Sequence, residues 1–502
     1  MVAGGIYERT SGAAGQPLSG YRRRTPERTV LYELVSTYRE SMLQHLREID
    51  PNGFGMPRHV ERELEAFLRC GLLEHGFTRV RCASCHDELL VAFSCKCRGL
   101  CPSCTSRRMA ETAAHVVDRL LPESRYRQWV LTVPKWLRLR LAREASFASW
   151  VNRLIVQAIA RWQRDRARAR GVRDGQTGAV TFVQRFGGLL QLSVHYHLVV
   201  PDGVFVIDEV TGELSLVPLP GPSEAEVLAI LDRVAARIAA RLADEAGDSC
   251  AVDDLDTPPD LWSQVQAEAT TPWRTRSASG SVVRGTEPGR AWSEGFSLHA
   301  GVVIAETDRA ALERLCRYGA RPAFAHGRLA WTDDGRISYR LKRRWHDGRS
   351  ELVLEPIAFL RRLCGIIPPP RRHLVKYHGI FGRAAKHRGQ LQRLVPVTDR
   401  RPSTCSDPTR TEPTAVASLW SSRRIPWADL LRRVFAEDVL ACVCGGRRDV
   451  VALVTDPPLA RTILDRLGLA HPPAVFTPRG PPSLFDVDPT PAFEPDPPAP
   501  DE

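Results

Sequence analysis

The segment from Leu190 to Ile207 constrains the fold of this chain more than any other, because it alternates as a β-strand does. Side chains of a strand point alternately to its two faces. One face is wholly apolar and predicts contact with a core; it consists of Leu192, Val194, Tyr196, Leu198 and Val200. The other face carries His195 and His197, whose imidazoles stand about 7 Å apart along the strand. A Pro-Asp-Gly turn at 201–203 then leads into a second strand.

Two imidazoles on one face of a rigid strand can hold a divalent metal ion. The simpler interpretation is a strand whose polar face is open to solvent, because a His-x-His pair alone is a common pattern. Other parts of the chain are needed to decide between the two.

Composition favours a multidomain protein with a polyanionic partner. The chain has 502 residues, of which 43% are hydrophobic, and this allows two to four domains with a substantial core. Its formal net charge is +12. The excess is local, because residues 336–401 contain 17 Lys or Arg and only 4 Asp or Glu. A concentrated basic segment is typical of nucleic-acid binding.

The cysteines predict a metal site. The N-terminus is polar and rich in Arg, unlike a secretory signal, and no apolar run is long enough to span a membrane, so we expect a cytoplasmic protein without a membrane partner. Six of the 13 cysteines lie between Cys82 and Cys104. In a chain without an export signal, such a cluster favours metal binding over disulfides.

Two C-x-x-C pairs separated by 15 residues have the spacing of a zinc ribbon. The predicted ligands are Cys82, Cys85, Cys101 and Cys104. Four thiolates leave no open coordination position, so the zinc is predicted to be structural. Cys95 and Cys97 are left over, as alternative ligands or buried free thiols. Cys442 and Cys444 near the C-terminus cannot complete a zinc site alone, and we interpret them as a partial knuckle.

Strand and helix patterns alternate irregularly, which predicts an α+β fold with a largely antiparallel sheet flanked by helices. The predicted organisation is a flexible N-terminus (1–28), a helical segment with the zinc ribbon (29–122), a catalytic domain (123–388) with a polar insertion at about 248–297, a linker (389–424), a small C-terminal unit (425–468) and a disordered, acidic, proline-rich tail (469–502).

A second chemical element runs from Arg371 to Arg388. Three prolines at 368–370 suit the start of a helix. Tyr377 lies among cations that we expect to contact DNA phosphates, namely Arg371, Arg372, Lys376, Arg383, Lys386 and Arg388. Such a tyrosine can attack a phosphodiester, because cations favour the phenolate and hold the DNA backbone. The alternative is a core tyrosine on an amphipathic helix.

Four blocks of sequence resemble bacterial rolling-circle transposases of the insertion-sequence-91 family. The blocks are SCKCRGLCPSCTSRRMAET, VTFVQRFGGLLQLSVHYHLVVPDGVF, LHAGVVIAETDRAALERLCRYGARPAF and HLVKYHGIFGRAAKHR. The first resembles the zinc-binding domain of that family, and the others resemble its catalytic core. The similarity runs from about Glu61 to Arg388, with a weaker trailing match at 425–468.

The resemblance implies a nuclease of the His-hydrophobic-His superfamily, with an antiparallel sheet flanked by helices. His195 and His197 would bind Mg²⁺ or Mn²⁺, and Tyr377 would attack single-stranded DNA at transposon ends. The products would be a 5′-phosphotyrosine link and a free 3′-OH that can prime synthesis by the host replication machinery. The resemblance also implies a bacterial, nucleoid-associated protein.

Two departures from the family pattern matter. Many members carry a second tyrosine four residues after the first, and here that position is Phe381, so the chain resembles the single-tyrosine branch. The motif also leaves the third ligand of the catalytic metal open among Gln184, Gln191 and His299.

Two other functional classes fit parts of the sequence. One is a noncatalytic DNA-binding regulator built on the zinc ribbon. The other is a rolling-circle replication initiator or relaxase, which makes the same cut; the sequence contains no helicase P-loop, which argues against a fused relaxase–helicase.

Overall fold

The computed structural model describes residues 23–248, 260–270, 284–344, 348–396, 438–469 and Phe476. Most of the predicted flexible N-terminus, linker and acidic tail lies outside these residues.

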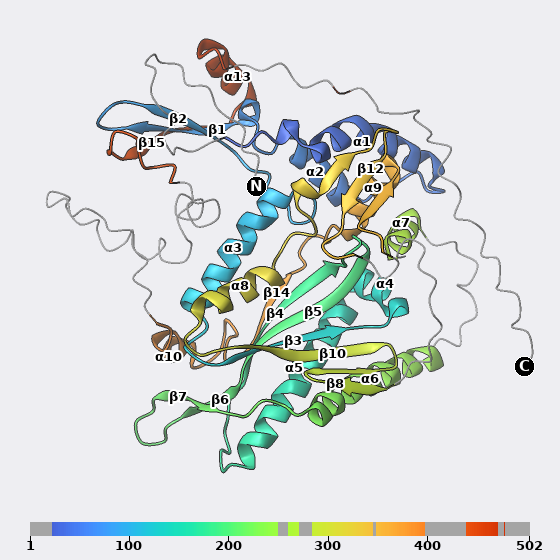
Figure 1. Cartoon of the computed structure of the whole chain (residues 1–502), viewed down its shortest axis with the longest axis vertical. Helices are drawn as coiled ribbons and strands as arrows, with labels where there is room; N and C mark the ends of the chain where they lie inside the picture. The colour runs from blue at the N-terminus through green and yellow to red at the C-terminus, as the bar shows by residue number, and fades with distance from the viewer. Residues whose placement is uncertain are drawn as a thin grey trace, which may run out of the picture.

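The centre of the molecule is a seven-stranded antiparallel sheet with the strand order β14-β4-β5-β3-β10-β9-β8 (Figure 1). Its strands are β3 (Tyr126–Thr132), β4 (Gly178–Phe186), β5 (Leu192–Pro201), β8 (Gly285–Glu287), β9 (Arg290–Ser293), β10 (Phe296–Ile304) and β14 (Val375–Gly379). The predicted α+β class with an antiparallel sheet is confirmed.

Some helices pack on the two faces of this sheet, and others belong to the parts of the chain around it. They are α1 (Val30–Ile49), α2 (Arg58–Leu68), α3 (Pro102–Arg119), α4 (Lys135–Arg143), α5 (Ala145–Arg168), α6 (Glu224–Asp248), α7 (Leu261–Thr270), α8 (Arg309–Gly319), α9 (Pro356–Ile366), α10 (Arg388–Arg393) and α13 (Pro457–Arg466). Short 3₁₀ turns are η1 (Pro26–Arg28), η2 (Leu73–His75) and η3 (His326–Arg328). Among the described helices, none combines the length and the apolar character that crossing a membrane would require.

The two faces of β5 belong to different cores, as its alternation predicts. The apolar face is at most 2% exposed and lies in the larger core together with side chains of α4, α5 and α6. The histidine face lies toward α3 and α8, which contribute Val116 and Leu312 to a second core with Val180 and Val199 of the sheet. In Figure 1, α3 and α8 run side by side along the sheet.

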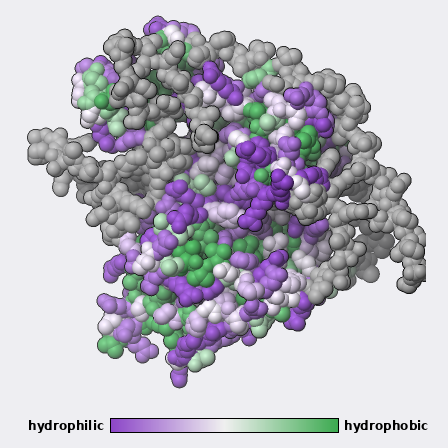
Figure 2. All heavy atoms as spheres, in the orientation of Figure 1, coloured by the Kyte–Doolittle hydropathy of each residue, from purple (hydrophilic) through white to green (hydrophobic). Residues whose placement is uncertain are grey.

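Three smaller sheets lie around this centre. They are β15-β1-β2, β11-β12-β13 and β6-β7, formed by β1 (Phe77–Cys82), β2 (Glu88–Ala92), β6 (Gly203–Ile207), β7 (Leu214–Pro218), β11 (Leu329–Trp331), β12 (Ile337–Arg340), β13 (Glu351–Leu354) and β15 (Arg448–Val454). The first of them pairs the predicted zinc ribbon with the C-terminal unit. The surface seen in Figure 2 is mainly hydrophilic, with an apolar patch near its middle.

One local prediction is wrong. The segment that contains Tyr377 is not a helix but the edge strand β14, whose side chains alternate against β4. The strand ends at Gly379, which has a φ of +59°, and a Cβ there would lie 1.9 Å from the carbonyl oxygen of Thr177. The described residues of the predicted polar insertion at about 248–297 include α7, β8 and β9.

Candidate active site and cysteine clusters

His195 and His197 lie side by side on β5, with their ring centroids 5.0 Å apart. His197 is only 5% exposed and His195 is half-buried. The strand that carries them is central, between β4 and β3, and the face is covered in part by α8. The interpretation as an open, solvent-facing strand is therefore wrong.

Both imidazoles are set up as neutral ligands. Burial, helped by the charges of Arg321 and Arg138, lowers the pKa of His195 to about 4. Burial, the neighbouring His195 and Arg321 lower the pKa of His197 to about 3. Because both pKa values lie far below 7, the rings carry free lone pairs at neutral pH.

The nitrogen available to a metal is Nε2 in each ring. Nδ1 of His195 donates to the carbonyl oxygen of Ser193 at 2.9 Å, which leaves Nε2 as the acceptor. Nδ1 of His197 lies 3.0 Å from the amide nitrogen of Gln128, and a half-turn of that amide would place its oxygen there to accept the Nδ1 proton. Nε2 of His197 is buried without a hydrogen-bond partner among the described residues. A buried nitrogen of this kind is expected to find a partner such as a metal.

Gln184 is placed directly opposite His195 on the neighbouring strand β4. Its amide nitrogen donates to the carbonyl oxygens of Tyr318 at 2.7 Å and Gly319 at 3.0 Å. These two acceptors fix the orientation of the amide, so its oxygen points away from them. That oxygen is buried and has no partner in the described part of the chain.

The other two candidates for a third ligand are placed less well. Gln191 lies in the turn before β5, where its side-chain oxygen accepts from the backbone N–H of Leu189. His299 is in register with Val130 of β3, which is in register with His197, so His299 lies two strands away. Of the three residues, Gln184 is therefore the one that combines pairing opposite His195 with a buried side-chain oxygen that has no partner in the described chain.

Tyr318 is a candidate nucleophile that the sequence patterns did not single out. It lies in the last turn of α8, and its ring centroid is 5.6 Å from that of His197, at an interplanar angle of 80°. The side chain is 47% exposed. The helix can approach the sheet here because its last residue is Gly319, where a Cβ would lie 2.7 Å from the ring of Phe182.

Cations surround this tyrosine. The guanidinium of Arg321 lies 4.9 Å from the Tyr318 ring and 4.9 Å from the Phe186 ring. The amine of Lys342 lies 5.9 Å from the Tyr318 ring. A sequence signal existed, because Arg317 and Arg321 lie close to Tyr318 in the sequence. It was the same kind of signal that favoured Tyr377.

Tyr377 shares the histidine face but lies further away. It is in register with Val180 of β4, which is in register with Val199 of β5, so two strand spacings, about 10 Å, separate it from the histidine strand. Its ring packs 6.4 Å from that of His115 on α3, and burial raises the pKa of its phenol. Phe381 is fully buried against Phe205, which is a packing role.

The cations predicted to bind DNA fall into two groups. Arg372 donates to the carbonyls of Ala142 and Arg143, Lys376 donates to the hydroxyl of Ser149, and Arg388 donates to the carbonyls of Phe381 and Gly382. These three tie the β14 segment to its surroundings. Arg371, Arg383 and Lys386 are exposed, as contact with a phosphate would require.

A basic cleft opens beside Gln184, between the start of α3 and the end of α8. The cations that line it are Arg98, Arg108, Arg185 and Arg321. Arg185 has a side-chain nitrogen that is buried without a partner among the described residues. The cleft thus joins the zinc-binding segment to the residues around Tyr318.

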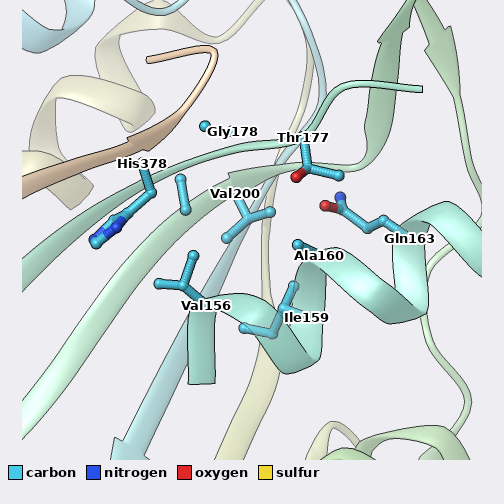
Figure 3. Close-up of a pocket in the computed structure, with 10 residues that line it drawn as sticks. Val156, Ile159, Ala160, Gln163, Thr177, Gly178, Val200 and His378 are labelled. Carbon is cyan, nitrogen blue, oxygen red and sulfur yellow. The ribbon is translucent and has the colours of Figure 1, made fainter. Parts of the chain in front are cut away.

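A second cavity lies on the opposite side of the sheet, between α5 and the strands β4 and β14. Figure 3 shows a mainly apolar lining that includes Val156, Ile159 and Val200. His378 is its one titratable lining residue, and burial and Lys376 lower its pKa to about 4. Apart from His378, the cavity lining contains no titratable side chain that could take part in acid–base catalysis.

The four predicted zinc ligands are not one set. Cys101 and Cys104 converge with Cys70 and Cys95, whereas Cys82 and Cys85 converge with Cys442 and Cys444. The correction has a physical reason: Cys101 and Cys104 begin α3, while Cys82 and Cys85 flank a turn at the far end of β1. Cys97 belongs to neither cluster and lies 3.6 Å from the carbonyl of Glu63.

The cluster of Cys70, Cys95, Cys101 and Cys104 holds the start of α3. The thiol of Cys104 lies 3.6 Å from Cys70 and 3.4 Å from Cys95. A helix N-terminus favours thiolates, which a metal requires. Because α3 then packs over the histidine face, a structural zinc here would fix one wall of the candidate site.

Two protein families match parts of this chain. Residues 178–388 match a family described as putative transposase, and residues 38–133 match a family described as transposase zinc-binding domain of the insertion-sequence-91 type. Comparisons with curated proteins and with solved structures found no significant match. The first match contains both histidines and Tyr318, and the second contains the cluster at the start of α3.

Proposed function

We propose that this chain, which belongs to the insertion-sequence-91 family of transposases, nicks and rejoins single-stranded DNA at transposon ends through a covalent tyrosine intermediate. The observation that carries this proposal is the closeness of Tyr318 to His197, with ring centroids 5.6 Å apart. A nucleophile beside a pair of neutral imidazoles is the arrangement that metal-assisted phosphodiester cleavage needs.

The residues present fit a divalent cation. Nε2 of His195, Nε2 of His197 and the amide oxygen of Gln184 would hold it, and the last two atoms are buried without partners in the described chain. The amide oxygen is compatible with Mn²⁺ or Mg²⁺, which the family resemblance implies, whereas the two imidazoles alone would also bind softer metals. When bound, the cation would polarise the scissile phosphate and orient it.

Tyr318 then serves as the nucleophile. Its phenolic oxygen forms a bond to phosphorus while the bond from phosphorus to the 3′-oxygen breaks. The phenolic proton passes to solvent, which reaches this half-exposed side chain, and the 3′-oxygen takes up a proton in turn. The products are a 5′-phosphotyrosine and a free 3′-OH, and attack by a 3′-OH on the phosphotyrosine reverses the step and rejoins strands. Host replication enzymes could extend that 3′-OH, as rolling-circle transposition requires.

The cations around Tyr318 support this role. Arg321 lies over the Tyr318 ring, and its Nε is buried without a hydrogen-bond partner among the described residues. It can hold the negative charge of the attacked phosphate and favour the phenolate. Arg98, Arg108 and Arg185 continue the positive charge along the cleft, where the DNA backbone would lie.

An assay for a covalent adduct with single-stranded DNA tests the proposal directly. Labelled DNA that contains a transposon end, incubated with the protein and Mn²⁺, should give an adduct that survives denaturation and is absent without metal. A noncatalytic regulator would bind the same DNA without forming the adduct, and that result would overturn the proposal.

The third metal ligand can be tested separately. Gln184→Ala should weaken Mn²⁺ binding by at least about 10-fold, because a buried oxygen donor is lost. Gln191→Ala is the matched control, since its amide serves a turn outside the site. Calorimetric titration with Mn²⁺ measures both, with melting curves to check folding. Equal affinity for Gln184→Ala and the unchanged protein would remove Gln184 from the ligand set.

A further inference from the structure

The second cysteine cluster joins parts of the chain that are more than 350 residues apart. Cys82 and Cys85 lie at the turn between β1 and β2, and Cys442 and Cys444 lie at the turn before β15. The Sγ atoms of Cys82 and Cys444 are 3.6 Å apart, and those of Cys85 and Cys442 are 3.5 Å apart. All four sulfur atoms lie within 4.8 Å of one another.

We propose that these four thiols bind a second zinc ion, which fastens the C-terminal unit (residues 438–469) to the N-terminal zinc-binding segment. Tetrahedral zinc with Zn–S bonds of about 2.3 Å places its sulfur ligands about 3.8 Å apart. A disulfide would require about 2.05 Å. The observed separations are therefore those of a metal site rather than of two disulfides.

The local backbone is built as two facing knuckles. The N–H of His86 donates to the carbonyl of Cys82, and the N–H of Gly445 donates to the carbonyl of Cys442. Gly445 has a φ of +84°, which favours glycine. At Gly446 a Cβ would lie 3.1 Å from the sulfur of Cys82 and 3.2 Å from that of Cys444, so the pair of glycines lets the second knuckle close on the first.

An ion pair lies beside the cluster and links the same two segments. Arg448 of β15 is directly opposite Cys82 of β1, and its guanidinium contacts the carboxylate of Asp87 at 2.6 Å. Arg448 is only 7% exposed. The register of β15 against β1 thus brings the cysteines together and gives the pair of turns a fixed relative position.

The apolar core of the C-terminal unit is small, so we expect this unit to depend on the proposed zinc ion for its stability. Val454, Ala460 and Leu464 are buried against Phe77 and Leu90. Three other large side chains of β15 are largely exposed: Val450 at 49%, Val451 at 50% and Leu453 at 65%. In Figure 2 this part of the surface, at the upper left, mixes apolar and hydrophilic residues. Small units with thin cores commonly depend on a metal or disulfide for stability.

The test is the zinc content of the full-length protein. We expect two zinc ions per chain in the purified protein and one in the double variant Cys442→Ser/Cys444→Ser. Cys97→Ser is the matched control and should retain two, because Cys97 lies in neither cluster. One zinc or none in the unchanged protein, or two in the double variant, would overturn the proposal.

A measurement on the unchanged protein covers the case in which the double variant does not fold. Cys85 and Cys444 are exposed, so without a metal both should react quickly with an alkylating reagent. We expect mass spectrometry to show both thiols protected in the zinc-loaded protein and alkylated at least 10-fold faster after treatment with a chelator. Equal rates before and after chelation would show that no metal is bound there.

Discussion

Tyr318→Phe should abolish formation of the covalent protein–DNA adduct, reducing it by about 1,000-fold or more. The substitution removes only the phenolic oxygen, and the side chain is half-exposed at the end of α8, so folding should be unaffected. Affinity for single-stranded DNA should stay within about 2-fold, because the ring and the cations around it remain. A denaturing gel with labelled DNA and Mn²⁺ measures the adduct, and fluorescence anisotropy measures the affinity.

Tyr377→Phe is the matched control, because it removes the same atom from a tyrosine on the same face of the sheet. It should leave the adduct in place, since Tyr377 is two strands from the histidine strand and packs against His115. The opposite pair of results, with the adduct lost in Tyr377→Phe and kept in Tyr318→Phe, would return the nucleophile to the residue predicted from the sequence. Loss in neither variant would rule out both tyrosines.

The contrast between the two tyrosines shows what sequence patterns can and cannot supply. Alternation predicted the histidine strand and its apolar face, because the period of a strand is a local property. Both tyrosines lie in basic surroundings, so local charge could not separate them. The choice depends on which one the tertiary fold brings to His197, and this is set by the approach of α8 to β4 at Gly319.

The prediction for Tyr377 also used the wrong periodicity. Prolines before the segment suit a helix start, yet Val375 and Tyr377 alternate as strand residues. Pairing with β4 completes an edge of the central sheet, and this long-range pairing outweighs the local helix signal.

The cysteines also show that sequence spacing alone cannot identify all the ligands of a metal site. The spacing of Cys82, Cys85, Cys101 and Cys104 suggested a single zinc site, because sequence spacing gives only nearby partners. Cys95, which the sequence left as an alternative ligand, joins Cys101 and Cys104, but the other completing ligands are distant: Cys70 lies 31 residues before Cys101, and Cys442 lies 357 residues after Cys85. Separations of that size leave no sequence pattern.

Loss of an imidazole should have the second large effect. His197→Ala is expected to remove metal binding and to reduce the adduct by about 1,000-fold, while DNA binding by the basic cleft persists. Without metal the substitution should still cost some stability, because it opens a cavity and removes the hydrogen-bond partner of the buried Gln128 amide.

Thermal unfolding distinguishes the loss of a metal-binding side chain from a general loss of folding stability. In the unchanged protein, Mn²⁺ at about 100 times its Kd should add about 2.7 kcal/mol of stability by mass action. In His197→Ala the melting temperature should not respond to Mn²⁺. His299→Ala is the control, because His299 lies on the same face but two strands away and should keep the full response. A His197→Ala protein that is still stabilised by Mn²⁺ would mean that the cation binds elsewhere, and the imidazole pair would then have to act on the phosphate without it.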